Sequence, residues 1–146
     1  MRGYERAMHD AGLPIFQQLI REGSFTAQEG STLAGELLDA SPRPTALFVS
    51  SNRLAQGALD QIKNRRLRMP DDIALCTFDD AAYYSFFTPS ITSVSANPQE
   101  FGFTAVQFLI DRISGAYKGD PRTYLAPCHI RVRESTAGVQ LPAQKG

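Results

Sequence analysis

Two nearly continuous apolar runs with a helical pattern between them constrain the fold of this chain more than any other feature. Residues 45–49 (TALFV) and 73–78 (IALCTF) have the composition of strands that are covered on both faces of a sheet. Between them, Leu54, Leu59 and Ile62 recur at the spacing of one helix face. Two parallel strands need a long crossover connection, so this strand–helix–strand order is typical of a parallel sheet. The sequence therefore predicts an α/β fold built on a parallel sheet.

Further periodic segments extend this order in both directions. Thr26 has the character of a helix N-cap, and Glu29 three residues later completes a capping box. The other predicted elements are a helix over residues 4–11, a strand near Leu19, a helix from 27 to about 40, a strand over 91–94, a helix after Pro98 that ends at Gly115, a last strand over 124–132 and a flexible tail over 137–146. Because the first helix begins directly after Met1, we expect the chain to begin inside a longer protein.

The charge balance excludes several classes of partner. The chain has 146 residues, and its 15 basic and 15 acidic side chains cancel, so it offers no electrostatic footprint for nucleic acid or an anionic membrane. Its apolar runs are too short to span a bilayer, and its first residues lack the pattern of a signal peptide. Cys76 and Cys128 are too few for a disulfide framework and fit a reducing compartment. These observations predict a cytoplasmic domain without membrane contact.

The adjacent carboxylates Asp79 and Asp80 follow a predicted strand directly and form the sharpest candidate site. Ligands of open α/β sheets bind outside the carboxyl ends of the strands. Such a pair could hold Mg²⁺ for phosphoryl transfer, accept hydrogen bonds from sugar hydroxyls, or cap the next turn through Asp80. The Mg²⁺ interpretation lacks a second acidic strand end, because Ser50 and Ser51 occupy that place. We favour recognition of hydroxyl groups.

Residues 50–53 (SSNR) follow the neighbouring strand and begin a helix, so their side chains and free amides face the same crevice. The run lacks the glycines of a phosphate-binding loop. For Ser51 and Asn52, helix capping and ligand contact both remain open.

The other reactive residue types favour structural roles. His9 and His129 have no paired nucleophile, and no G-x-S-x-G elbow occurs. Cys128 and His129 are neighbours on a predicted strand and point to opposite faces, so they form no catalytic pair. The basic cluster over 63–68 lies at a helix C-terminus, where cations stabilise the helix dipole.

Four aromatic residues crowd into positions 83–87 (YYSFF). A small domain cannot bury all of them, so the segment is either a subunit interface or a lid packed over the sheet edge.

The order of several short motifs resembles the LacI/GalR-type bacterial transcription repressors. The motifs are residues 44–59 (PTALFVSSNRLAQGAL), 69–80 (MPDDIALCTFDD), 88–94 (TPSITSV), Phe101-Gly102 with Ala105 and Leu109, and 133–136 (REST). Each motif is weak, but five of them in order from Gly3 to about Thr136 make the resemblance specific.

The resemblance implies the C-terminal part of an effector-binding domain that is similar to a periplasmic sugar-binding protein, with two α/β subdomains hinged about a cleft. Residues 1–136 would form this part, with about 97–115 crossing to the other subdomain and 125–136 returning. The helix-turn-helix headpiece, most of the N-terminal subdomain and one central strand would be absent. That strand would lie between the strands near Leu19 and Phe48. Its absence predicts unpaired strand edges, which aggregate. We therefore expect either that a second segment or chain fills the gap or that this chain is a fragment of a larger protein.

Site residues follow from the same resemblance. Asp79 would bind effector hydroxyls, Phe25 would stack on the effector, and Ser51 would also contact it. Asn52 and Arg53 stand where the family more often has Asp and a neutral residue, and they are further candidates for effector contact. A family arginine would precede Met1 and is missing. The residues implied in a dimer interface are Gln56, Tyr83, Tyr84, Phe86 and Phe87.

The implied protein is not an enzyme and has no catalytic residue, metal or cofactor. Its partners would be a sugar-like effector and a second copy of the chain, with DNA bound only through the absent headpiece. Arg53 suggests an anionic sugar. The alternatives are a solute-binding protein of a sugar transporter and a Mg²⁺-dependent phosphoryl-transfer enzyme that uses Asp79 and Asp80.

Overall fold

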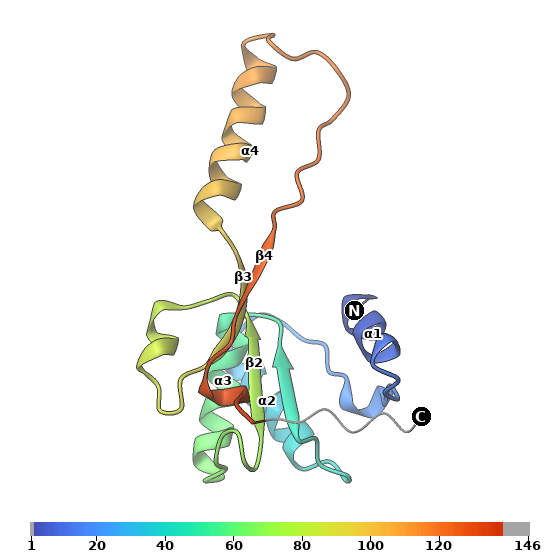
Figure 1. The fold of residues 1–146 in the computed structure, drawn as a ribbon, viewed down its shortest axis with the longest axis vertical. Coiled ribbons are helices and arrows are strands. Elements are labelled where there is room, and N and C mark those ends of the chain that lie inside the picture. Colours follow the sequence, from blue (N-terminus) through green and yellow to red (C-terminus); the bar gives the residue numbers. More distant parts are fainter. Residues whose placement is uncertain (1, 139–146) are drawn as a thin grey trace.

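A four-stranded sheet with helices against it forms the body of the molecule, and one long helix stands away from that body (Figure 1). The computed structural model describes residues 2–138. Its elements in chain order are α1 (Arg2–Asp10), η1 (Gln17–Leu19), α2 (Ala27–Leu38), β1 (Ala46–Val49), α3 (Asn52–Asn64), β2 (Ala74–Phe78), η2 (Ala82–Phe86), β3 (Thr92–Ala96), α4 (Pro98–Ile113), β4 (Cys128–Arg131) and η3 (Glu134–Thr136). Of the predicted tail, residues 139–146 lie outside the described residues.

The sheet has the order β1-β2-β3-β4. The first three strands are parallel, which confirms the predicted α/β fold. The last strand runs antiparallel to β3, with Ala96 opposite Cys128 and Ser93 opposite Arg131. The prediction of a final strand is confirmed, but that strand turns back along its neighbour because the chain leaves through β3 and returns beside it.

Side-chain caps begin the three longer helices. The Thr26 hydroxyl accepts a hydrogen bond from the Glu29 amide at 3.1 Å, and the Ser51 hydroxyl accepts one from the Leu54 amide at 3.2 Å. The Asn97 amide oxygen accepts one from the Gln99 amide at 3.1 Å. Each cap satisfies a backbone donor that the helix itself cannot pair. The cap predicted at Thr26 is confirmed.

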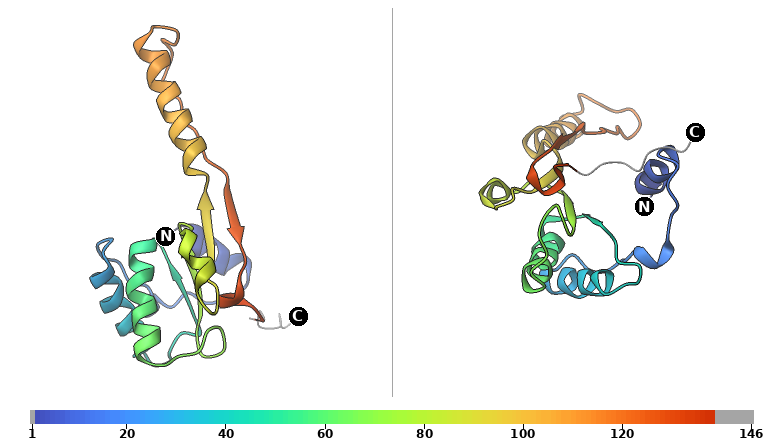
Figure 2. Two further views of the ribbon diagram at one scale, coloured as in Figure 1. Left: turned by 90° about the vertical axis from the view of Figure 1, so that its left-hand side faces the viewer. Right: turned by 60° about the horizontal axis from the view of Figure 1, so that its bottom comes forward.

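Helices α2 and α3 pack closely because glycines lie where they cross (Figure 2). A Cβ on Gly57 would lie 2.0 Å from the carbonyl oxygen of Ala27, and a Cβ on Gly30 would lie 2.2 Å from the carbonyl oxygen of Leu54. The core that these helices share with the sheet consists of Leu38, Leu47, Ala55, Ile62, Ile73, Leu75, Ala81, Tyr84 and Ile91.

The strand predicted near Leu19 is wrong. Residues Gln17–Leu19 form a single 3-10 turn, and the segment that follows joins no sheet in the described part of the chain. The physical reason lies at β1, which pairs with β2 and has no second neighbour among residues 2–138. Without an adjacent strand, the backbone groups near Leu19 have no ladder to join.

The prediction that β1 is covered on both faces is also wrong. Leu47 is buried against the helices, but Phe48 is 57% exposed and Ala46 is exposed as well. Phe48 faces a groove of about 470 Å³ that runs between β1 and the segment after η1. The groove bears out the unpaired strand edge and the exposed apolar surface that the resemblance predicted. That another segment or chain fills it stays a prediction.

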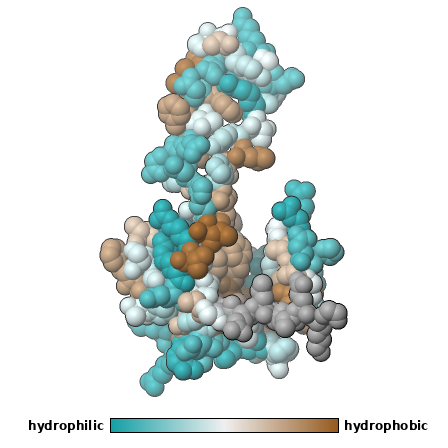
Figure 3. Space-filling model, viewed as in Figure 1, coloured by the Kyte–Doolittle hydropathy of each residue, from teal (hydrophilic) through white to brown (hydrophobic). Residues whose placement is uncertain are grey.

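Residues 97–127, which we call the excursion, leave the body after β3 and return through β4 (Figures 1 and 2). Apolar side chains reach the surface on the excursion and at its base (Figure 3). Those of the excursion are Phe101, Phe103, Val106, Leu109, Ile110, Ile113 and Leu125, and those of β4 and the residue after it are Ile130 and Val132. Among the described helices, none is long and apolar enough to cross a membrane.

Candidate functional site

The carboxyl ends of β1 and β2 bring two predicted site residues to the same edge of the sheet. Val49 is the register partner of Thr77, so Ser51 and Asp79 each lie two residues beyond paired positions. Asp79 is exposed and its φ is 70°, in the left-handed region that asparagine and aspartate tolerate better than most residues. Within residues 2–138 its carboxylate accepts no hydrogen bond and forms no ion pair. The turn therefore presents an open carboxylate beyond the strand.

The start of α3 forms the other half of this edge. The Ser51 hydroxyl accepts the hydrogen bond of the Leu54 amide, which confirms its capping role. Asn52 and Arg53 lie in the first helical turn, where backbone amides point outward and favour negatively charged ligand groups. Arg53 is exposed. Contact of these three residues with a ligand stays a prediction.

Asp80 is placed quite differently from Asp79. Its carboxylate accepts hydrogen bonds from Ser93 Oγ at 2.7 Å and from Arg133 Nη1 at 3.0 Å, and it pairs with Arg131 Nη1 at 2.9 Å. Burial raises the pKa of Asp80, but these hydrogen bonds and the two positive charges outweigh burial and lower that pKa overall.

Two of the interpretations of the acidic pair lose support from this geometry. The turn that follows begins at Ala81 with no side-chain cap, so the capping role of Asp80 is wrong. Two arginines already neutralise Asp80, which disfavours a shared Mg²⁺ site, and the described residues hold no group of three side chains suited to a metal.

Phe25 lies in the groove beside β1, which reaches the carboxyl end of that strand at Ser50. Its ring is 62% exposed, and it lines the groove beside β1 together with Phe48 and Ser50. Asp79 is not among the residues that line that groove. The structure therefore brings Phe25 and Ser50 together and leaves Asp79 outside. The remaining groove residues are Tyr4, Leu19, Ile20, Arg21, Glu22, Gly23, Gly30, Leu33, Ala34, Leu37, Pro44, Ala46, Leu47, Val49, Leu54 and Ala58.

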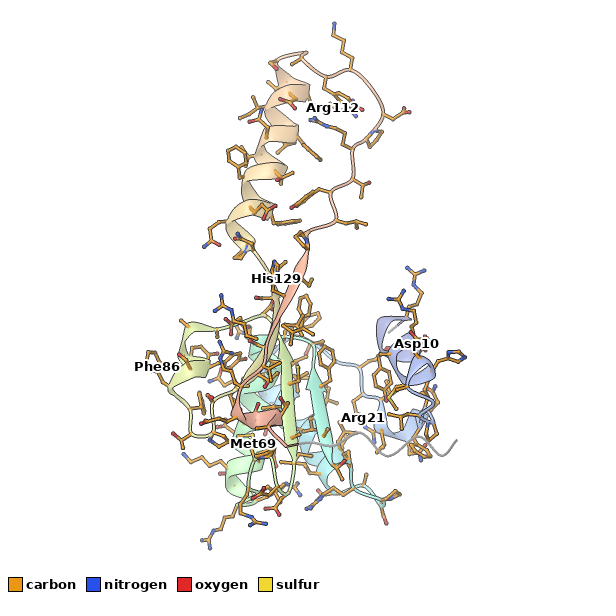
Figure 4. The ribbon with its side chains drawn as sticks, viewed as in Figure 1. Asp10, Arg21, Met69, Phe86, Arg112 and His129 are labelled. Atoms are coloured by element: carbon orange, nitrogen blue, oxygen red, sulfur yellow. The ribbon has the colours of Figure 1, made fainter. Side chains whose placement is uncertain are left out.

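The aromatic segment η2 divides between the core and the surface. Phe86 is 85% exposed and points outward from the body (Figure 4), and Tyr83 and Phe87 are exposed as well. Tyr84 is the exception, because its side chain is fully buried in the core and is not available to a partner. Its assignment to an interface is therefore wrong. Gln56, on α3, is exposed.

The Tyr84 hydroxyl is buried without a hydrogen-bond partner. The nearby Thr77 hydroxyl donates instead to the carbonyl oxygen of Asp79 at 3.3 Å. Burial, the largest cause, raises the pKa of Tyr84 to about 12. This neutral, poorly solvated phenol is close enough to Asp79 for the charge of that carboxylate to raise its pKa further.

Two arginines of the basic cluster form ion pairs within the body, which is a structural role, and the stabilisation of the helix dipole stays a prediction. Arg65 forms an ion pair with Asp39, and Arg68 pairs with Asp72 at 2.9 Å. Among the other reactive types, His9, His129 and Cys128 are exposed, and burial raises the pKa of the half-buried Cys76 thiol.

The sequence pattern assigned no role to several residues that organise this region. Arg131 and Arg133 pair with Asp80, and Ser135 is fully buried between β2 and β3. The available signal was Arg131 within the predicted strand over 124–132 and Arg133 directly after it, since an arginine that is buried needs a partner.

Comparison with known proteins places these features in context. Residues 1–136 match the family of periplasmic binding protein-like domains. The transcriptional repressor CytR of Escherichia coli strain K12 is 33% identical over 136 residues, which cover 93% of this chain and 40% of the repressor. Catabolite control protein A of Priestia megaterium is 29% identical over 93% of this chain and 41% of its own length. The chain thus spans about 40% of the length of these relatives.

Solved structures agree with the sequence comparison. The transcriptional regulator CelR in complex with cellobiose has a TM-score of 0.85 and 31% identity, over 92% of this chain and 41% of that one. A LacI-family regulator of Sanguibacter keddieii has a TM-score of 0.84 and 33% identity, over 93% of this chain and 51% of that one.

Proposed function

The chain belongs to the periplasmic binding protein-like domains of LacI-family transcriptional regulators, and from this membership we propose that it senses a small sugar-like effector in such a regulator. The curated relatives that match are regulators, which favours this function over a transporter's solute-binding protein. DNA binding would belong to a helix-turn-helix headpiece outside this chain, and the regulator would act in the cytoplasm. No cofactor is needed for this function.

The observation that carries the proposal is the open carboxylate of Asp79 at the end of β2. It is exposed, it is held on a left-handed turn, and it forms no hydrogen bond or ion pair within residues 2–138. A carboxylate accepts strong, oriented hydrogen bonds from hydroxyl groups, and ligands of open α/β sheets bind at this end of the strands.

The polar and charged residues near Asp79 support a sugar-like ligand. Ser51 and Asn52 supply polar groups one strand away, and Arg53 supplies a positive charge. One matched regulator was solved with cellobiose, which supports a sugar. Arg53 adds the hypothesis of an anionic sugar, such as a sugar phosphate or a uronic acid. Phe25, which lines the groove that reaches Ser50, would stack on the apolar face of the ligand.

The domain would respond to the bound effector by a shift in the equilibrium between two of its conformations. A ligand changes such an equilibrium only by its difference in affinity for the two states. Ligand at the strand ends would favour one orientation of the excursion, and the regulator would respond as a dimer formed through Gln56, Tyr83, Phe86 and Phe87.

Isothermal titration calorimetry with cellobiose, glucose, glucose 6-phosphate and glucuronate tests the proposal. We expect at least one sugar to bind, and Asp79→Asn to weaken that binding at least tenfold. Asp60→Asn is the matched control, because Asp60 is an exposed aspartate on α3 away from the strand ends. Equal affinity in both variants would contradict the role of Asp79.

The charge of Arg53 requires a separate comparison. If the effector is anionic, Arg53→Ala lowers affinity for glucose 6-phosphate or glucuronate more than for glucose. The same loss for all three sugars, or none, would remove support for an anionic effector.

A further inference from the structure

The two strands that carry the excursion leave the body side by side. Strands β3 and β4 form an antiparallel pair, and His129 marks the point where the pair rises from the body (Figure 4). Helix α4 and residues 114–127 lie beyond this pair (Figures 1 and 2). The direction of β3 and β4 therefore sets the direction of the whole excursion.

Asp80 contacts both of these strands at once. Its Oδ1 accepts hydrogen bonds from Ser93 Oγ on β3 and from Arg133 Nη1 just after β4, and its Oδ2 pairs with Arg131 Nη1 on β4 at 2.9 Å. The Asp80 and Arg133 side chains are 11% and 16% exposed, so water screens this ion pair little. Arg133 Nη1 also donates to Ser93 Oγ at 2.9 Å, which closes a ring of contacts.

The base of the same two strands is fixed independently of Asp80. The Ser135 hydroxyl accepts from the Thr92 amide and donates to the Leu75 carbonyl oxygen. The Thr92 hydroxyl accepts from the Arg133 amide at 2.8 Å. Strand β3 also stays paired with β2 as far as Val94. Loss of the Asp80 carboxylate would therefore leave the strands attached through their backbones and remove the side-chain contacts that hold Arg131 and Arg133 against the body.

We propose that Asp80 is a positioning residue whose carboxylate fixes the direction in which β3 and β4 carry the excursion away from the body. Asp79 and Asp80 are consecutive, so a ligand that shifts the backbone at Asp79 also shifts the backbone that holds Asp80. This coupling rests on the proposed function, whereas the positioning role does not.

Distance measurements between spin labels test the positioning role without any ligand. One label replaces Asp60 on α3 and the other replaces Lys118 on the excursion, both exposed, in a chain that carries Cys76→Ala and Cys128→Ser. We expect Asp80→Asn to broaden the distribution of label distances at least twofold. Asp80→Glu restores the charge and should recover part of the narrow distribution.

Two further variants keep the test decisive. Asp72→Asn removes another arginine-paired aspartate, at the opposite end of β2, and should leave the distribution unchanged. Arg131→Gln removes the ion pair between Arg131 and Asp80 by changing an exposed side chain. It replaces Asp80→Asn in the test if that variant does not fold. An unchanged distribution in both Asp80→Asn and Arg131→Gln, or equal broadening in Asp72→Asn, would overturn the proposal. A failure to bind sugars would overturn the proposed function and leave this result standing.

Discussion

The hydroxyl of Ser135 accepts a hydrogen bond from the backbone amide of Thr92 at 2.8 Å, across 43 residues of sequence. The same hydroxyl donates to the carbonyl oxygen of Leu75 at 2.7 Å. The ladder between β2 and β3 begins just beyond, at Cys76 and Thr92. A side chain from the end of the described chain thus joins two strands at the position where their backbones do not pair directly.

Replacement of Ser135 by alanine should therefore destabilise the fold. It would leave a buried amide and a buried carbonyl without partners, at a cost of about 1–3 kcal/mol in the free energy of unfolding. Ser114→Ala removes an exposed hydroxyl at the end of α4 and should change that free energy by less than about 0.5 kcal/mol. Urea denaturation followed by circular dichroism measures both variants. If Ser135→Ala lowered the free energy of unfolding no more than Ser114→Ala does, the hydrogen bonds of Ser135 would not stabilise the fold.

The crossing of α2 and α3 gives a second prediction. A Cβ on Gly57 would lie 2.0 Å from the Ala27 carbonyl oxygen and 2.3 Å from the Ser31 amide nitrogen, and backbone atoms cannot turn aside. We expect Gly57→Ala to lower the free energy of unfolding by about 2–3 kcal/mol. Gly102 on α4 has open space around it, so Gly102→Ala should stabilise the chain by about 0.5–1 kcal/mol. Thermal unfolding of the two variants should shift in opposite directions.

The buried hydroxyl of Tyr84 predicts a response to alkaline pH. Its pKa is raised from 10.0 to about 12, mainly by burial, so this group leaves the stability of the fold unchanged below pH 10 and lowers it as pH rises from 10 toward 12. Tyr84→Phe removes a hydroxyl that has no partner, and we expect it to unfold at the same or a higher urea concentration at pH 7. Urea midpoints measured from pH 8 to pH 12 should fall less steeply in this variant than in the parent chain.

The carboxylate of Asp80 predicts the opposite response at low pH. Its pKa is lowered from the ordinary value of 3.8, so its stabilisation is present above that value and is lost as pH falls below it. Asp80→Asn lacks this titration, and its urea midpoint should fall less between pH 5 and pH 3. Parallel curves for the parent chain and Asp80→Asn in this range would contradict the prediction.

Self-association tests the proposed interface. Phe86 is 85% exposed on η2 and belongs to the proposed dimer interface. Phe86→Ser removes its apolar ring and should raise the dimer dissociation constant at least tenfold. Phe103 on the excursion is 72% exposed and provides the matched variant Phe103→Ser, which should have little effect. Sedimentation velocity over a range of concentrations distinguishes the two. A larger effect of Phe103→Ser would move the interface to the excursion.

Features that depend on neighbouring residues were predictable from the sequence. The cap at Thr26 depends on Glu29 three residues later, and the strand around Leu75 is an apolar run whose composition already implies burial. The basic residues predicted at a helix C-terminus do begin in the last turn of α3, at Lys63, where cations are favourable. Such interactions join residues that are close in the sequence, so the caps and strands that they form can be predicted without knowledge of the rest of the chain.

Features that depend on distant residues were not predictable. Asp80 pairs with Arg133, which lies 53 residues later in the sequence, and no rule of sequence spacing predicts that pair. The segment near Leu19 has strand-like composition, but β1 has no second partner strand in the described residues, and composition does not reveal this. Tyr84 and Phe86 lie two positions apart in one aromatic run, yet one is buried and the other exposed. The fold around them decides which ring enters the core.

The adjacency of Ala96 and Cys128 has a consequence for how such a chain can change over time. The chain departs and returns at neighbouring points, so residues 97–127 are attached as the tip of a hairpin is attached to its two strands. Such a segment is a cassette: it could be shortened, exchanged or grafted onto a related body without rerouting β1, β2 or β3. Recombination at these two positions would give a regulator a new surface while keeping the strand ends, and the carboxylate they present, as they are.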